Sequence, residues 1–281
     1  MADAKATDQL SDPLTDELLG LARDLARAAG EVLRARPDDL GVTTKSGPTD
    51  VVTVMDKAAE KVILAGLAQA RPDDAVVSEE SAASGGSSGV RWLVDPLDGT
   101  VNYLYGIPRY AVSIAAEVGG ESVCGVVLDV VLGQEYTAIR GAGAYRDGVR
   151  LACSTQIDPA QALLATGFAY DVGRRTVQAR TIATVLPVVR DIRRFGSAAL
   201  DLCDVACGRV DAYYEAGMHP WDWAAGALIA REAGARVDGL SGRPPGNHTT
   251  LAANPVLFDV LHHVLVAANA DGAPTEGTTG G

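Results

Sequence analysis

Apolar residues near the start of the chain recur at the spacing of a helix. The stripe begins after Asp12-Pro13 and comprises Leu18, Leu21, Ala22, Leu25, Ala29, Val32 and Leu33. Residues at this spacing lie on one face of an α-helix, so the stripe predicts a helix with one buried side. A second helix is predicted from about Asp56 to Ala70, with Pro72 ending it. The small residues of 81–89 indicate an exposed loop.

Between Val90 and Leu151 the pattern changes from helical spacing to the alternation that is typical of strands. Two turn signals interrupt it, Gly119-Gly120 and the hairpin signal Asp147-Gly148. Strands are predicted around 112–116, at 123–131 and at 135–139. The segment is therefore predicted to form an antiparallel meander.

From about Ala152 onward, short apolar runs alternate with longer helical patterns. Strands are predicted at 163–165, 191–195, 211–214, 236–237 and 251–253, and helices at 174–189, 197–207, 221–233 and 255–267. Such alternation favours a layered α/β half. We therefore predict two halves, 12–151 and 152–268, between disordered tails at 1–11 and 269–281, which are poor in large apolar residues.

Composition narrows the possible partners. The chain has 281 residues, 47% of them apolar, and a formal net charge of −12. Binding to a nucleic-acid backbone requires clustered Lys and Arg, so no direct nucleic-acid partner is expected. The four cysteines form no C-x-x-C pair, and the start of the chain lacks the basic and apolar segments of a secretory signal. No run approaches the roughly 18 apolar residues of a membrane span, so we expect a cytoplasmic protein with reduced thiols.

Acidic residues stand at four predicted element boundaries: Asp56, Glu79, the pair Asp95 and Asp98, and Asp222. In Asp95-Pro96-Leu97-Asp98, a strand is expected to run into Asp95 and to stop at Pro96. The turn could place two carboxylates and the Leu97 carbonyl around one point, and these are the oxygens that Mg²⁺ prefers. The alternative is an Asp-rich turn whose carboxylates only cap a helix.

Gly99 and Thr100, which follow directly, are predicted to open a helix whose free N–H groups favour an anion. An anion beside several carboxylates would be repelled unless a metal lay between them. The combination therefore indicates metal-assisted phosphoryl chemistry. The spacing D-x-x-D-G-T is one residue longer than the D-x-D-x-T of haloacid dehalogenase phosphatases, which argues against a phosphoaspartate intermediate.

Several segments in order resemble the motifs of one enzyme family. They are KSGPTDVVTVMD, VSEES, WLVDPLDGTVNYLYGIP, FGSAALDLC, GRVDAYYEAGMHPWD and HPWDWAAGALIAREAGARV. Together they resemble the inositol monophosphatase family over about residues 15 to 267. The resemblance implies an α-β-α-β-α sandwich, with a larger antiparallel sheet in the first half and a smaller mixed sheet in the second.

The resemblance also implies two to three Mg²⁺ ions in the active site. Glu79, Asp95 and the Leu97 carbonyl match the ligands of the first ion, and Asp95, Asp98 and Asp222 match those of the second. A third, weaker ion would involve Glu79 and waters. A water activated by the metal would attack phosphorus directly, without a covalent intermediate. Asp56 and Thr100, together with Glu79, match the residues that position this water.

The remaining site positions follow the same resemblance. Gly99 and Thr100 match backbone donors to the phosphate, which also lies against Asp98 and Asp222. The family positions that contact the alcohol half of the substrate are matched by Gly196, Ser197, Ala198 and Glu215. Lys45 matches a mobile loop that closes near the metals.

The implied activity is hydrolysis of inositol 1-phosphate, a small phosphorylated polyol, by a lithium-sensitive homodimer. Sister enzymes of the family take histidinol phosphate, fructose 1,6-bisphosphate or nucleoside 3′,5′-bisphosphates, and these alternatives stay open because the metal motifs are nearly shared. A role as a binding partner of the transcription machinery is the alternative from another class.

Overall fold

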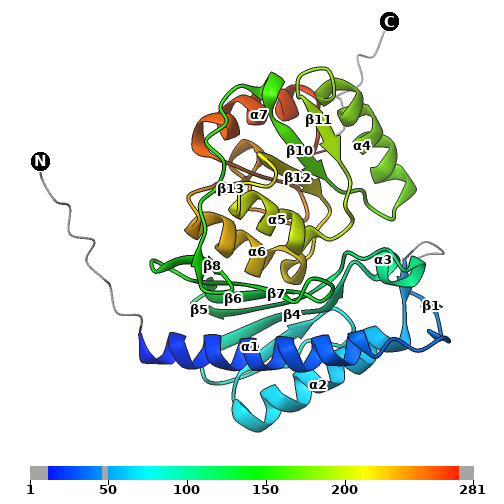
Figure 1. Ribbon diagram of the computed structural model, residues 1–281, viewed down its shortest axis with the longest axis vertical. Coiled ribbons are helices and arrows are strands. Elements are labelled where there is room, and N and C mark those ends of the chain that lie inside the picture. Colours follow the sequence, from blue (N-terminus) through cyan, green and yellow to red (C-terminus); the bar gives the residue numbers. More distant parts are fainter. Residues whose placement is uncertain (1–11, 46–49, 272–281) are drawn as a thin grey trace, which may run out of the picture.

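The computed structural model describes residues 12–45 and 50–271. Helices and sheets alternate in five layers (Figure 1): two long helices, a seven-stranded sheet, two helices, a five-stranded sheet and two more helices. This arrangement confirms the predicted α-β-α-β-α class. The segments 1–11, 46–49 and 272–281 lie outside the described residues, so most of the two predicted tails and part of the KSGPTD motif are not tested.

The outer helices of the first half are α1 (Pro13–Arg34) and α2 (Val54–Ala70), as the periodicity predicted. The Asp12 carboxylate accepts the N–H of Leu14 and caps α1. Thr53 and Asp56 form a capping box at the start of α2. The apolar faces of both helices pack with one face of the seven-stranded sheet in a shared core.

The seven-stranded sheet has its strands in chain order: β3 (Ala75–Ser78), β4 (Val90–Asp98), β5 (Ala111–Val118), β6 (Glu121–Asp129), β7 (Gln134–Ile139), β8 (Gly143–Arg146) and β9 (Val149–Arg150). Every neighbouring pair from β4 to β9 is antiparallel, which confirms the meander. The edge strand β3 was not predicted and is parallel to β4. It leads directly to Glu79.

Pro96 does not end strand β4, contrary to the prediction. The strand continues to Asp98, because Asp95 pairs with Ser113 and Asp98 with Ala111. β4 therefore carries one residue more than β5 over this interval, which is a β-bulge. Proline has no N–H to donate to a neighbouring strand, and a bulge is one place where a sheet tolerates it. Asp95 and Asp98 thus lie on one irregular strand end.

The five-stranded sheet is mixed. Its strand order is β11 (Asp191–Arg193), β10 (Leu163–Thr166), β12 (Ala212–Ala216), β14 (Thr249–Ala253) and β13 (Arg236–Gly239). α4 (Val172–Val185) and α7 (Pro255–Ala267) lie on its outer side (Figure 1). α4 ends four residues before its predicted end, because Pro187 follows and has no N–H to continue the helix.

The middle layer consists of α5 (Ala198–Ala206) and α6 (Pro220–Glu232), packed between the two sheets (Figure 1). Every residue of α6 from Ala224 to Ala230 is buried. Small side chains permit this close packing: a Cβ placed on Gly125 of β6 would lie 3.0 Å from the Cα of Ala225. The hydroxyl of Ser113 on β5 donates to the Trp221 carbonyl, so the start of α6 is tied to the larger sheet.

Three short elements complete the first half: β1 (Thr43–Thr44), β2 (Val51–Val52) and α3 (Thr100–Tyr105). α3 begins at Thr100, as predicted. No helix within the described residues is long and apolar enough to cross a membrane.

Two helical glycines allow packing to be separated from helix propensity. Gly20 of α1 has nothing within 4 Å of an added Cβ, whereas on Gly226 of α6 that Cβ would lie 2.8 Å from Leu202 Cβ. We expect Gly226→Ala to lower the free energy of unfolding by about 1–3 kcal/mol, and the matched control Gly20→Ala to raise it by about 0.5–1 kcal/mol. Urea denaturation measures both. A gain from both substitutions would contradict the close packing of α6 on α5.

Candidate active site

A cavity of about 500 Å³ gathers almost all of the predicted site residues. It is lined by Lys45, Glu79, Asp95, Leu97, Asp98, Gly99, Thr100, Gly196, Ser197, Ala198, Glu215 and Asp222, among others. Residues from both sheets and from the middle helices therefore meet in one place. Of the predicted residues only Asp56 does not line the cavity; it is fully buried behind Thr100.

Asp98 joins strand β4 to helix α5. Its Oδ2 accepts the Ser197 hydroxyl at 2.6 Å and the Ala199 N–H at 2.7 Å. Asp98 thus supplies a negative charge at the N-terminus of a helix, where the free N–H groups stabilise it. Asp95 has fewer such donors: its Oδ1 accepts the N–H of Leu97 at 3.0 Å, and its side chain is almost fully buried.

Asp222 holds the corresponding place at the start of α6. Its Oδ2 accepts the N–H of His219 at 2.7 Å. The same carboxylate lines the cavity. Helix capping and a role in the cavity are therefore compatible for Asp222, as they are for Asp98.

Burial and mutual repulsion raise the pKa values of these carboxyls. Burial is the main cause for Asp95, whose pKa is raised further by the charges of Glu79, Asp98 and Asp222. Burial also raises the pKa of Asp98 to about 6, although the Ser197 hydroxyl and the Ala199 N–H oppose this. The pKa of Asp222 is raised by burial and then by Glu79. A cation among them would reverse this tendency.

Lys45 supplies a positive charge at the rim of the cavity. Its ammonium donates to Glu79 Oε1 at 2.7 Å and also to Glu80. Partial burial alone would lower the pKa of Lys45, but Glu79 and Glu80 raise it above its usual value. Burial raises the pKa of Glu80 to about 7 despite this ion pair.

Thr100 and Asp56 form a hydrogen-bonded chain that leads from the cavity into the interior. The Thr100 hydroxyl lies 2.8 Å from Asp56 Oδ1 and 3.1 Å from the Leu97 carbonyl oxygen, so its proton has an acceptor on the protein side. Asp56 Oδ2 accepts the N–H of Thr53 at 2.8 Å and its hydroxyl at 2.6 Å. Burial raises the pKa of Asp56, and the hydrogen bonds from Thr53 and Thr100 oppose this.

Gly99 occupies a position that other residues cannot easily take. Its φ of +101° lies in the left-handed region, and an added Cβ would lie 3.1 Å from the Arg109 carbonyl oxygen and 3.3 Å from that of Gly196. The turn after β4 therefore packs closely against the segment that precedes α5.

Glu215 lies within strand β12, where the sequence suggested a position after the strand. Its Oε2 accepts the Tyr213 hydroxyl at 2.7 Å. Burial raises the pKa of Glu215 to about 7, although the hydrogen bond from Tyr213 and the charge of Arg194 oppose this. The carboxylate faces Gly167 so closely that any Cβ there would overlap it.

Two residues that support the cavity were missed from the sequence. The Arg109 guanidinium donates to Asp201 at 2.8 Å and Asp204 at 2.7 Å on α5. The Asn102 side-chain amide donates to the carbonyl oxygens of Phe195 at 2.7 Å and of Arg109 at 2.8 Å. Both fix the segment that carries Gly196 to Ala198. For Arg109 the sequence did contain a signal, because Asp201 and Asp204 lie three residues apart on an apolar helix and require a cationic partner when buried.

The donor chemistry of the cavity suits a hard divalent cation, because carboxylates and the Leu97 carbonyl are the ligand types that Mg²⁺ takes. Within residues 12–45 and 50–271, however, no three His, Cys, Asp or Glu side chains already converge closely enough to hold one ion. Lys45, Ser197 and backbone N–H groups hold several of these carboxylates. The types of ligand fit, and the assignment of single residues as ligands stays a prediction.

The five-layered fold and its carboxylate-lined cavity define a protein of the layered α/β class with an acidic site where its two sheets meet. The chain belongs to the inositol monophosphatase family, whose sequence model matches residues 14–278.

Relatives carry two kinds of name. The inositol-1-monophosphatase of Mycobacterium leprae (strain TN) is 47% identical over 284 residues, which cover 92% of this chain and 96% of that protein. The Nus factor SuhB of Escherichia coli (strain K12) is 40% identical over 244 residues, covering 85% and 90%. The crystal structure of the extragenic suppressor protein suhB from Bartonella henselae matches with a TM-score of 0.83 and 37% identity, covering 89% and 98%. The Nus factor names mean that the expected absence of a nucleic-acid partner is not supported.

The raised pKa of Glu215 predicts a pH-dependent stability. The folded state holds this proton up to about pH 7, whereas the ordinary pKa is 4.5. The folded state thus binds more protons between these values, and the free energy of unfolding falls as pH rises through them. Gln keeps an oxygen for Tyr213 and cannot ionise, so we expect Glu215→Gln to be more stable than wild type by about 1–3 kcal/mol at pH 8 and equal to it near pH 4. Urea titrations at both pH values measure this; a variant that is no more stable at pH 8 would contradict the assignment.

Proposed function

We propose that the protein is a magnesium-dependent phosphomonoesterase that hydrolyses inositol 1-phosphate to inositol and phosphate. The observation that carries the proposal is the gathering of Glu79, Asp95, Asp98 and Asp222 in one cavity. Burial there disfavours the charged forms of the three aspartates. Such a site attracts cations strongly. The mycobacterial relatives named inositol-1-monophosphatase support the choice of substrate.

Glu79, Asp95, the Leu97 carbonyl, Asp98 and Asp222 would hold two to three Mg²⁺ ions. Bound there, divalent cations supply charge neutralisation for the phosphoryl oxygens and a lowered pKa for water. The carboxylates and the phosphate can share the cavity only when such a charge separates them.

Thr100 and Asp56 would orient the attacking water. Because the Thr100 hydroxyl proton is directed to Asp56 or to the Leu97 carbonyl, the lone pairs of its oxygen are available to a water in the cavity. That water is then fixed for attack on phosphorus, and Glu79, which also lines the cavity, would be a further acceptor. The N–H groups of Gly99 and Thr100 would face the phosphate oxygens.

The alcohol half would lie toward the second sheet. The carboxylate of Glu215 can accept hydroxyl protons of a polyol, and the backbone of Gly196 to Ala198 lines the cavity beside it. Lys45 would close the opposite rim through its ion pair with Glu79. The homodimeric state and the lithium sensitivity stay predictions.

A substrate panel tests the proposal. Phosphate release is measured from inositol 1-phosphate, histidinol phosphate, fructose 1,6-bisphosphate and adenosine 3′,5′-bisphosphate, each with Mg²⁺ and with EDTA. We expect Mg²⁺-dependent release with a preference for inositol 1-phosphate. Asp95→Asn should lower this activity more than ~100-fold, since it removes a charge on which the cation depends. The matched control is Asp259→Asn, because Asp259 is exposed on α7 and its carboxylate forms, among the described residues, a salt bridge with the surface residue Arg236 alone.

Preference for another ester would leave the proposed metal chemistry unchanged and would assign to this protein the substrate of a sister enzyme. Near-wild-type activity of Asp95→Asn would contradict the assigned site. No release from any ester by the folded protein with Mg²⁺ present would favour the second candidate, a binding partner of the transcription machinery, to which the relatives named Nus factor point.

A further inference from the structure

The position of the Glu215 carboxylate depends on two neighbours, one on its own strand and one on the next. Alternate side chains of a strand point to the same face of the sheet, so Tyr213 and Glu215 lie side by side on β12. The Tyr213 hydroxyl donates to Glu215 Oε2 at 2.7 Å and also lies 3.2 Å from the sulfur of Met218. Burial raises the pKa of Tyr213, so this hydroxyl keeps its proton. One oxygen of the carboxylate is therefore held by a fully buried side chain.

The neighbouring strand β10 leads to Gly167, which lies beside Glu215. Residues 164–166 pair in register with residues 212–214 of β12, so Gly167 and Glu215 are the next residues of the two strands. A Cβ added to Gly167 would overlap the carboxylate, and the three atoms nearest to it all belong to Glu215. Gly167 does not adopt a left-handed conformation. Glycine is therefore required here by the carboxylate and not by the backbone.

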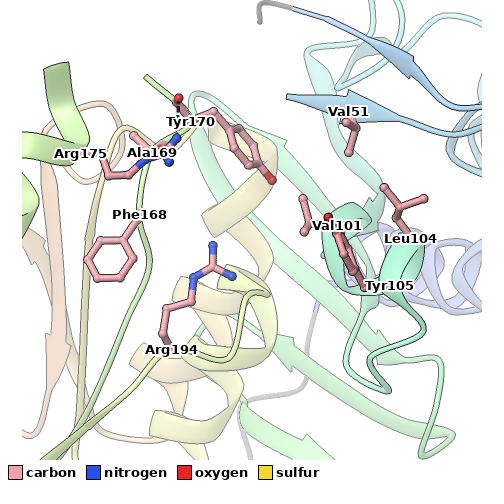
Figure 2. A pocket seen from close by; sticks show the side chains of 9 residues that line it. All are labelled: Val51, Val101, Leu104, Tyr105, Phe168, Ala169, Tyr170, Arg175 and Arg194. Atoms are coloured by element: carbon pink, nitrogen blue, oxygen red, sulfur yellow. Dashed lines mark hydrogen bonds between the residues drawn. The ribbon is translucent and has the colours of Figure 1, made fainter. Parts of the chain in front are cut away.

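The backbone on both sides of Gly167 is anchored, so it cannot easily move away from the carboxylate. Before it, the Thr166 hydroxyl donates to the Tyr214 carbonyl oxygen at 2.8 Å. After it, the Arg175 guanidinium donates to the Ala169 carbonyl oxygen at 3.1 Å (Figure 2). The same stretch forms one wall of a smaller, largely apolar cavity of about 360 Å³ next to the active site (Figure 2). A larger residue at position 167 would therefore displace the carboxylate and not the strand.

Such a fixed acceptor can discriminate between alcohols. Glu215 and Gly167 both line the active-site cavity. A site that hydrogen-bonds a hydroxyl of the substrate rejects an analogue without that hydroxyl, because the buried polar group of the site is then left unpaired. The discrimination requires that the acceptor stays in one place, since a displacement of about 1 Å is enough to lose much of a positioned contact.

We propose that Gly167 and Tyr213 are positioning residues that fix where Glu215 accepts a hydroxyl of the substrate. Gly167 leaves the space that the carboxylate occupies, and Tyr213 orients it. Together they set the preference for polyol phosphates over phosphates of alcohols that carry no further hydroxyl. This inference rests on the proposed phosphatase function and deepens it by naming residues that determine its specificity.

Two esters isolate the contribution of the hydroxyls: inositol 1-phosphate and cyclohexyl phosphate. Both join the phosphate to a secondary carbon of a six-membered ring, and only the first offers hydroxyls to Glu215. The ratio of their kcat/KM values, measured with Mg²⁺, defines the polyol preference. Where release from cyclohexyl phosphate is slow, its Ki as a competitor replaces its KM.

Tyr213→Phe keeps the buried ring and removes the donor. We expect it to lower the polyol preference about tenfold, mainly through a higher KM for inositol 1-phosphate, while the values for cyclohexyl phosphate stay unchanged. Tyr145→Phe is the matched control, because the Tyr145 hydroxyl donates to the Ala142 carbonyl oxygen at 3.2 Å on β8, outside the cavity lining. This variant should keep the full preference.

A double-mutant cycle tests whether Gly167 acts through Glu215. We expect Gly167→Ala to lower the polyol preference at least about tenfold. Glu215→Ala removes the carboxylate and makes room for the added methyl group. In that background, adding Gly167→Ala or Tyr213→Phe should change the remaining preference by less than about twofold, because residues that act through one shared partner are not additive.

The outcomes separate the two proposals. No release from inositol 1-phosphate by the folded wild type overturns the proposed function and this inference with it. Release by the wild type, with an unchanged preference in Tyr213→Phe, overturns the inference alone. An equal loss for both esters also contradicts it, as does a further loss when Gly167→Ala is added to Glu215→Ala. If Gly167→Ala fails to fold, Tyr213→Phe alone and combined with Glu215→Ala decides the question.

Discussion

Burying several carboxylates in one cavity is the constraint on which the rest of the site depends. Asp95 is almost fully buried, and Asp98 and Asp222 are held close enough to raise its pKa. Such an arrangement is unfavourable in isolation, because each charge loses hydration and repels its neighbours. The protein compensates with donors: Ser197 and the start of α5 bind Asp98, and the start of α6 binds Asp222.

The middle helix layer meets this constraint through its packing. α5 and α6 can direct their N-termini at the end of β4 only because small residues allow close approach, as between Gly125 and Ala225 and between Gly226 and Leu202. The bulge at Pro96 gives β4 the extra residue that lies between Asp95 and Asp98. Arg109 neutralises Asp201 and Asp204 inside α5 and so supports the segment before that helix. The packing of the core therefore determines where the donors to the cavity carboxylates lie.

Much of the fold could be predicted from local pattern. The apolar stripes of α1 and α2, the alternation of β5 and the Pro255 start of α7 are signals within a single segment. The missed features depend on distant partners. β3 is four residues long and mostly half-buried, so it shows no alternation. The path of β4 through Pro96 depends on the register with β5, which no local spacing reports.

In the site too, local motifs predicted some features, whereas others depend on contacts between distant segments. Motifs identified the cavity residues, but they did not show that Asp56 lies behind Thr100, because this position depends on how α2 packs against β4. The apolar cavity of Figure 2 could not be predicted at all, since its walls come from residues near 51, 101–105, 168–175 and 194. Surfaces formed by such distant segments exist only once the two halves are packed.

Isothermal titration calorimetry of Mg²⁺ into the protein tests the central claim most directly, because it measures cation binding without requiring a known substrate. The account predicts saturable binding to wild type and to Asp259→Asn, and its loss or a Kd at least about tenfold weaker in Asp222→Asn. Asp222→Asn keeps an oxygen for the His219 N–H and changes only the charge. Absence of saturable binding to the folded wild type, or equal affinity in Asp222→Asn, would contradict the claim that these carboxylates are gathered to hold a metal.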